Sequence, residues 1–326
     1  MKIIFAGTPE VALPSLEALL AGPHEVVHVV TRPDAPLGRK RVLTPSPVAA
    51  RAEEAGVPTT RAARLGGETG EALAAIEADL GVVVAFGGLI REPLLSSPKH
   101  GWINLHFSKL PAWRGAAPVQ HALINGDTEI GTDIFRLVAE LDAGEIIASE
   151  THAVAPDITA GELLAALAES GAALLARTVD AIAGGSAVSA VQVGEPSFAG
   201  KLGLEDAFLA FDAPAASIYG RYRGVTPEPG AFTLVDGARF KILRAARADL
   251  AAQPEPIALA AGEIRLVGKR VLVGCADGAL ELVRVQPAGK QAMDAGSWWR
   301  GLGASPTPRA ALTTDTSATS TEGETR

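Results

Sequence analysis

The chain has almost no residues that could crosslink it. Cys275 is the only cysteine among 326 residues, so no disulfide can form within the chain. A secreted scaffold stapled by disulfides is therefore excluded, and so is a structural zinc site built on cysteine pairs. A chain of this length can bury a sizeable core without such staples, and its length suggests about two domains.

Long apolar runs are also missing. No uninterrupted run approaches the roughly 18 apolar residues of a transmembrane helix. The apolar start of the chain ends at Gly7, and Thr8 and Pro9 follow too early for a signal-peptide core. We therefore predict no membrane segment and a cytoplasmic location.

Excess positive charge is absent. The chain carries 29 Lys and Arg against 37 Asp and Glu, a net charge of −8, which excludes a uniformly basic coat for nucleic acid. A local basic patch stays possible, because the negative charge is concentrated in residues 1–200 and residues 201–312 are mildly cationic.

Three common ligand motifs are incomplete or missing. Neither G-x-G-x-x-G nor G-x-x-x-x-G-K-[ST] is present, so nothing here requires NAD or ATP, and the absence of G-x-S-x-G weakens a hydrolase interpretation. His24 and His28 are four residues apart, but His28 falls in a predicted strand rather than on a helical face. We predict no metal site.

The first half alternates strand and helix patterns. Apolar runs predict strands at 2–6, 26–30, 82–86, 102–106, 131–137 and 146–150, and helical spacing predicts helices near 11–20, 48–55, 73–80 and 160–183. Thr8 is predicted to cap the first helix. Such alternation favours an α/β fold with a Rossmann-like, doubly wound, mostly parallel sheet over residues 1–185.

The second half changes character. After a predicted linker at 186–204, short strands flank turns such as Asp236-Gly237, a strong hairpin signal. Several short strands in this region predict a small β-barrel over 205–312. The tail 313–326 is almost entirely Thr, Ser, Ala, Gly and acid, so we predict that it is disordered.

The most informative stretch is Asn104-Leu105-His106. Side chains alternate along a strand, so Asn104 and His106 should point to one side and Leu105 to the other. A carboxamide and an imidazole side by side suit a developing oxyanion, and the carboxyl end of a parallel strand is where open α/β sheets hold ligands. The alternative is a solvated strand end with no chemical role.

Two further segments could complete a site. Residues 108–120 form a Pro- and Gly-containing loop, of the kind that often holds substrate after a central strand. Asp142 precedes a tight turn, from which its carboxylate could orient an imidazole or take a proton. The alternative for Asp142 is a simple turn cap.

The order of several motifs carries a resemblance that covers about residues 1–312. The motifs are Phe5-Ala6-Gly7-Thr8-Pro9, Asn104-Leu105-His106, Ser108-x-Leu110-Pro111, Trp113-Arg114-Gly115-Ala116-Ala117-Pro118, Leu141-Asp142-x-Gly144 and Gln286-Pro287-Ala288-Gly289-Lys290. In these the chain resembles the methionyl-tRNA formyltransferases, a branch of the folate-dependent formyltransferase family.

The resemblance implies a fold, a reaction and a set of residues. The fold is a Rossmann-like domain followed by an OB-fold-like barrel. The reaction moves a formyl group from 10-formyltetrahydrofolate to the methionine amino group of initiator methionyl-tRNA, without metal. The catalytic residues fall on Asn104, His106 and Asp142. The folate-binding residues fall on Ser108, Lys109, Leu110 and Pro111 and on Phe86, Gly87, Gly88, Leu89 and Ile90.

The resemblance also implies a tRNA-binding loop. It falls on residues 31–47, where Arg39, Lys40 and Arg41 would meet phosphates. Further candidate cations in the second half are Lys201, Arg221, Arg223, Lys241, Arg244 and Arg247. Lys109 and Phe107 depart from the family's usual Leu and Gly, which affects the folate loop.

The expected chemistry assigns each residue a role. Asn104 and His106 would donate to the oxyanion, and Asp142 would orient His106 and help to remove the amine proton. We expect a monomer that binds tRNA and no membrane. The alternatives are a formyltransferase acting on a small amine, such as a nucleotide-linked amino sugar or glycinamide ribotide, and a catalytically silent RNA-binding protein.

Overall fold

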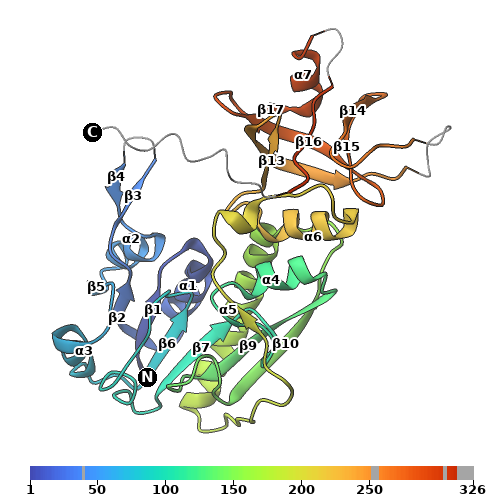
Figure 1. Ribbon diagram of the computed structural model, residues 1–326. Coiled ribbons are helices and arrows are strands. Elements are labelled where there is room, and N and C mark those ends of the chain that lie inside the picture. The colour runs from blue at the N-terminus through green and yellow to red at the C-terminus, as the bar shows by residue number, and fades with distance from the viewer. Residues whose placement is uncertain (39–40, 251–256, 304–306, 314–326) are drawn as a thin grey trace. The chain divides into compact units, whose positions relative to one another are not determined.

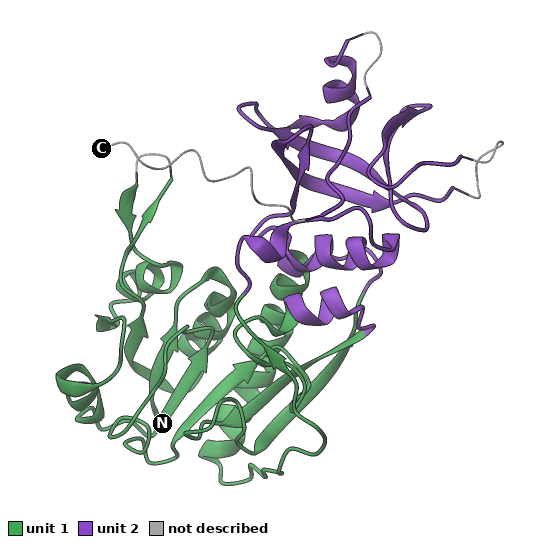
Figure 2. Ribbon diagram, in the orientation of Figure 1, with its two compact units in different colours: residues 1–119, 129–154, 162–201 green, residues 120–128, 155–161, 202–326 purple. Residues whose placement is uncertain are grey.

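The structure is a computed structural model that describes residues 1–38, 41–250, 257–303 and 307–313. The chain divides into two compact units, shown in different colours in Figure 2. Unit 1 comprises residues 1–119, 129–154 and 162–201, and unit 2 comprises residues 120–128, 155–161 and 202–326. The tail predicted to be disordered lies outside the described residues except for Thr313.

Unit 1 is built on a seven-stranded sheet with the order β10-β9-β7-β6-β1-β2-β5 (Figure 1). Its strands are β1 Lys2–Gly7, β2 Glu25–Thr31, β5 Thr59–Arg61, β6 Leu80–Val84, β7 Trp102–His106, β9 Glu129–Arg136 and β10 Ile146–Ala153. The first five pair in parallel and β9 and β10 are antiparallel, which confirms the predicted mostly parallel sheet.

The helices of unit 1 follow the predicted pattern with one correction. They are η1 Glu10–Ala12, α1 Leu13–Ala21, α2 Pro47–Glu54, α3 Gly67–Ala74 and most of α5 Ala160–Ala183. The helix predicted near 73–80 is wrong, because Leu80 already pairs with Ile3 in the sheet and α3 ends at Ala74. Burial in the parallel sheet overrides the helical spacing there.

Two other expectations about unit 1 need correction. Thr8 caps no helix, because its hydroxyl instead donates to the Phe86 carbonyl at 2.9 Å and so ties β1 to the end of β6. Residues 31–47 are not a plain loop: β3 Ala35–Leu37 and β4 Val42–Thr44 pair as an antiparallel hairpin. Arg39 and Lys40 lie outside the described residues.

The segment predicted as a linker takes part in unit 1. β11 Phe198–Ala199 pairs in parallel with β8 Arg114–Gly115, and Ala190 bridges Ile146. Residues up to Lys201 belong to unit 1. The domain boundaries at 185 and 205 stay a prediction.

Unit 2 holds a curled antiparallel sheet, which confirms the predicted barrel-like domain. Its strands are β12 Phe232–Val235, β13 Ala238–Arg247, β14 Ile264–Val267, β15 Arg270–Gly274, β16 Ala279–Pro287 and β17 Met293–Asp294, and its helices are η2 Glu205–Ala207, α6 Ala215–Gly224, α7 Ala295–Arg300 and most of α4 Pro118–Asn125. Asp236 and Gly237 turn the β12–β13 hairpin with φ of 50° and 80°, as the sequence predicts.

The segment around residue 310 connects the two edges of this sheet. Ala310 bridges Val235 on β12, and Arg309 bridges Glu263 next to β14. The sheet curls around a core that includes Phe211, Phe240 and Trp298. In the described part of the chain, no helix combines the length and apolar character needed to cross a membrane.

The sheet of unit 1 has a point where no side chain fits. A Cβ added at Gly81 of β6 would stand 2.1 Å from the Trp102 ring, and Trp102 is 1% exposed with its indole N–H donating to the Leu94 carbonyl at 2.8 Å. Because the indole is fixed by this hydrogen bond, we predict that Gly81→Ala lowers the free energy of unfolding by about 1–3 kcal/mol.

Urea unfolding followed by tryptophan fluorescence would measure this loss. Gly184→Ala is the matched control, because its added Cβ meets nothing closer than 3.4 Å. Equal stability of both variants would contradict the close packing of β6 on β7.

Candidate active site

Unit 1 contains a cavity of about 700 Å³ at the carboxyl ends of β6 and β7. Open α/β sheets bind ligands at this edge, and pockets of this size suit small molecules. The predicted site residues that line it are Phe86, Gly87, Gly88, Leu89, Asn104, His106 and Asp142. The structure therefore brings the three predicted catalytic residues to one cavity.

Strand alternation places two of these residues as predicted. Asn104 is half-buried and lines the cavity, as does His106. Leu105, predicted to point to the opposite side, reaches α5, where a Cβ added at Gly171 would stand 3.0 Å from its side chain, but it lines the cavity as well. Within the described residues the Asn104 carboxamide makes no hydrogen bond, so its N–H groups are available to a ligand.

The His106 imidazole is held by main chain. It is 6% exposed, packs edge-on against Phe135 and lies 3.0 Å, through Nε2, from the Trp113 carbonyl oxygen. A carbonyl only accepts, so Nε2 carries a proton and Nδ1 is the nitrogen left for chemistry. The neutral ring can take a proton at Nδ1, and the charged ring can then donate from it.

Asp142 lies in the turn between β9 and β10. Its Oδ2 accepts a hydrogen bond from the Gly115 N–H at 2.7 Å. Gly144 lets the turn fold back on β9, because a Cβ there would stand 1.7 Å from the Arg136 carbonyl oxygen. The expected hydrogen bond from Asp142 to His106 does not occur among the described residues; Trp113 orients the imidazole instead.

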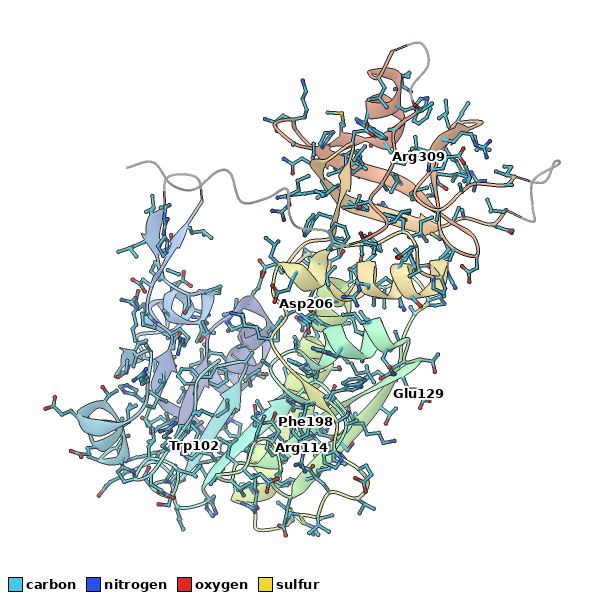
Figure 3. All side chains as sticks on the ribbon, in the orientation of Figure 1. Trp102, Arg114, Glu129, Phe198, Asp206 and Arg309 are labelled. Carbon is cyan, nitrogen blue, oxygen red and sulfur yellow. The ribbon has the colours of Figure 1, made fainter. Side chains whose placement is uncertain are left out.

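The segment Trp113 to Gly115 thus contacts both residues, and its backbone is unusual. Trp113 has a φ of 60° and Gly115 a φ of 122°, and a Cβ on Gly115 would stand 2.6 Å from the Ala199 carbonyl oxygen. Arg114 is buried beside Phe198, its partner in the β8–β11 pair (Figure 3). Only glycine fits at position 115.

The expected folate-binding residues fall into two groups. Residues Phe86 to Leu89 line the cavity, and Gly87, with a φ of 76°, leaves open space where a side chain would stand. Bare backbone of this kind suits the close approach of a flat ring.

The second group consists of Ile90 and residues 108–111, which do not line the cavity. The Ser108 hydroxyl donates to the Ala112 carbonyl at 2.6 Å, the Leu110 N–H donates to Asp133 at 2.7 Å, and Lys109 is exposed. Their contact with a ligand stays a prediction.

Several residues of the cavity wall escape sequence reasoning. They include Arg114, Gly115, Leu141 and residues 198–200. Arg114 and Gly115 stand in the loop that the sequence singles out, and Leu141 precedes Asp142. No sequence signal predicts that residues 198–200 line the cavity, because their segment has neither periodicity nor clustered polar residues.

The sequence analysis also misses a buried carboxylate beside the site. Asp133 on β9 is fully buried opposite His106 in the β7–β9 ladder. It accepts hydrogen bonds from the Leu110 N–H and the Ser149 hydroxyl. Burial raises the pKa of Asp133 above its ordinary value, and these hydrogen bonds and the neighbouring His106 oppose the rise.

Comparison with known proteins decides the family. The formyl transferase family model matches residues 1–179, and the model of the formyl transferase C-terminal domain matches residues 201–303. The chain belongs to the formyl transferase family. It is 57% identical to a methionyl-tRNA formyltransferase of Leifsonia xyli and 53% identical to one of Clavibacter michiganensis. These matches cover 93% of this chain and 98% and 97% of the relatives, and they confirm the predicted methionyl-tRNA formyltransferase branch.

Solved structures confirm the fold. An N-formyltransferase from Helicobacter canadensis, in complex with folinic acid and dTDP-3-aminofucose, superposes with a TM-score of 0.66 at 16% identity over 88% of this chain and 99% of that one. A methionyl-tRNA formyltransferase from Clostridium thermocellum gives a TM-score of 0.52 at 16% identity over 76% and 94%. Both share the fold of this chain.

The raised pKa of Asp133 predicts how stability depends on pH. When a carboxyl binds its proton more tightly in the folded chain than in the unfolded chain, the free energy of unfolding falls as pH rises. The fall begins near the unfolded pKa, about 3.9, and ends above the folded pKa. We predict that Asp133→Asn removes this loss, so that the variant gains stability relative to the original chain across that window. Urea unfolding at a series of pH values would measure the difference.

A surface change controls for the removed charge. Asp212 is exposed, so Asp212→Asn removes one carboxylate without touching a buried site. A stability difference between Asp133→Asn and the original chain that stays constant with pH would refute the prediction.

Proposed function

We propose that the chain transfers the formyl group of 10-formyltetrahydrofolate to the methionine amino group of initiator methionyl-tRNA. One observation carries the proposal: Asn104, His106 and Asp142 meet in one cavity. The relatives that bear this activity in their name support it, because seven of them are 50–57% identical over 92–93% of the chain. The expectation of a cytoplasmic monomer stays a prediction.

The cavity suits the proposed donor. The bare backbone of Gly87 and Gly88 would meet the flat pterin ring. Residues 108–111 follow His106 in the sequence and stay predicted folate contacts. An adjoining cavity of about 480 Å³ shares Leu89 and is lined by Arg64 and Arg91. These two cations would bind the carboxylates of the folate's glutamate tail. When bound, the folate supplies the activated formyl group.

The side chains of this site can serve the acyl transfer. As the neutral amine attacks the formyl carbon, negative charge develops on the formyl oxygen, and the Asn104 carboxamide donates to it. The Asp142 carboxylate is held at Oδ2 by Gly115, so Oδ1 would accept a proton from the amine. The bond between the formyl carbon and the folate nitrogen then breaks, the carbonyl re-forms, and the charged His106 ring would give its Nδ1 proton to the leaving nitrogen.

The hairpin β3–β4 would contact the tRNA. It projects Leu37, Val42 and Leu43, which are 67%, 59% and 67% exposed, and Arg41 at its turn is exposed as well. Exposed apolar residues next to the basic run at 39–41 suit the flat face of an unpaired base flanked by phosphates.

The candidate cations of the second half differ in exposure. Lys201, Lys241 and Arg244 are exposed and could meet phosphates. Arg247 is exposed but lies 3.7 Å from Asp157, and Arg221 donates to the Asp206 carbonyl. Arg223 is buried against the Tyr219 ring, so a role in packing suits it better.

A direct assay tests the proposed function. Formyl transfer would be followed with three acceptors: charged initiator tRNA, uncharged initiator tRNA and a nucleotide-linked amino sugar. We expect product only with charged tRNA. Transfer to the amino sugar alone would overturn the proposal in favour of the small-amine alternative.

The proposed role of His106 gives a sharp prediction. His106→Ala should lower kcat about 100-fold or more, because the cavity then has no proton carrier at this position, while tRNA affinity changes less than about twofold. Single-turnover kinetics and tRNA titration would measure both. The control is His100→Ala, because His100 precedes the amino end of β7, whereas the cavity lies at its carboxyl end. A fully active His106→Ala enzyme would remove this residue from the mechanism.

The basic run at the hairpin gives a prediction about salt. Replacing Arg39, Lys40 and Arg41 together with Ala should weaken tRNA binding and flatten the dependence of log Kd on log salt concentration by roughly 0.7–0.9 for each phosphate that these cations neutralise. Titrations at several salt concentrations would measure the slope, with the exposed Lys99→Ala as control. An unchanged slope would exclude the hairpin from the interface.

A further inference from the structure

The segment between α5 and β11 carries one polar side chain that joins two parts of the cavity wall. Gln192 accepts hydrogen bonds at Oε1 from Arg114, 3.2 Å from Nε and 2.7 Å from Nη2. Its Nε2 donates to the carbonyl oxygens of Asp142 at 2.7 Å and of Gly144 at 2.9 Å. One side chain therefore connects β8 with the turn that presents Asp142.

The chemistry of the partners fixes the orientation of this amide. A guanidinium only donates and a carbonyl only accepts, so turning the Gln192 amide over would set donor against donor and acceptor against acceptor. Both N–H donors and two acceptor positions are used. Glutamate at this position would keep the acceptors and lose the donors, and methionine would lose both.

The backbone of the β9–β10 turn at Asp142 is held by contacts from outside the turn. Asp142 has a φ of 46°, in the left-handed region that few non-glycine residues adopt without support from their surroundings. Its carboxylate is held by the N–H of Gly115, the residue after Arg114. Gln192 therefore links the backbone of the turn to β8, the strand whose Gly115 also holds the carboxylate. These two contacts together fix the position of Asp142.

We infer that Gln192 is a positioning residue for formyl transfer, which holds the Asp142 carboxylate at the reacting amine by fixing the β9–β10 turn. The inference rests on the proposed function, in which Asp142 accepts the amine proton. Gln192 acts through Asp142, since it does not line the cavity itself.

Two variants test this role by steady-state kinetics. Gln192→Glu removes the hydrogen bonds to the turn and keeps those to Arg114, and Gln192→Met removes all four without adding charge. A small misplacement of a catalytic group can cost up to about 100-fold, so we expect kcat to fall about 10- to 100-fold with KM for donor and tRNA changed less than about twofold. Val193→Ala is the control, because its side chain is 84% exposed.

A merely structural role would give a different pattern. It would lower the thermal midpoint or raise both KM values, with kcat of the folded enzyme unchanged. Either that pattern or a kcat within twofold of the original enzyme in both variants would overturn the inference.

A double-mutant cycle isolates the path through Asp142. In single-turnover reactions, adding Gln192→Met to Asp142→Asn should cost no further rate, because the group that Gln192 positions is already gone. If Asp142→Asn is slow and the double variant is slower still, by the product of the two single losses, the role of Gln192 is refuted and that of Asp142 stands. A normal rate for Asp142→Asn would refute the proposed role of Asp142 and this inference with it.

Discussion

The candidate active site depends on one stretch of backbone, Trp113 to Gly115. The Trp113 carbonyl accepts from His106, and the Gly115 N–H donates to Asp142. These are main-chain groups, so their chemistry does not vary with the side chain; what matters is the path of the chain. That path needs positive φ at both residues and no side chain at Gly115, where the backbone of Ala199 lies close by. The β8–β11 pair holds it in place.

Sequence reasoning identified the parts of the site that local rules govern. Alternation along one strand predicted that Asn104 and His106 face the same side, and both line the cavity, although Leu105 between them lines it as well. The sheet and the β12–β13 hairpin at Asp236 and Gly237 followed from similarly local patterns. The family resemblance then placed Asp142 with them, although the sequence distance between β7 and the β9–β10 turn gives no hint of that proximity.

The contacts that orient these residues could not be predicted, because they join segments without local signals. The Trp113 N–H bonds the Ser197 hydroxyl, and Gln192 reaches Asp142, both from a stretch that reads as a linker. The hairpin β3–β4 was hidden by its prolines and charges, which are typical of loops. In each case a long-range pairing overrides what the neighbouring residues favour on their own.

Asp133 on β9 and Asp142 in the β9–β10 turn show how the surroundings of a carboxylate decide whether it serves the fold or the reaction. Asp133 is fully buried, both of its oxygens accept hydrogen bonds, and its raised pKa reflects the cost of ionising it there. Asp142 is half-buried at the cavity, with one oxygen held by Gly115. A group that must accept a proton needs a fixed position and an oxygen that faces the substrate. Asp142 meets the first need through contacts on its backbone and one oxygen, which leaves the second oxygen to the reaction.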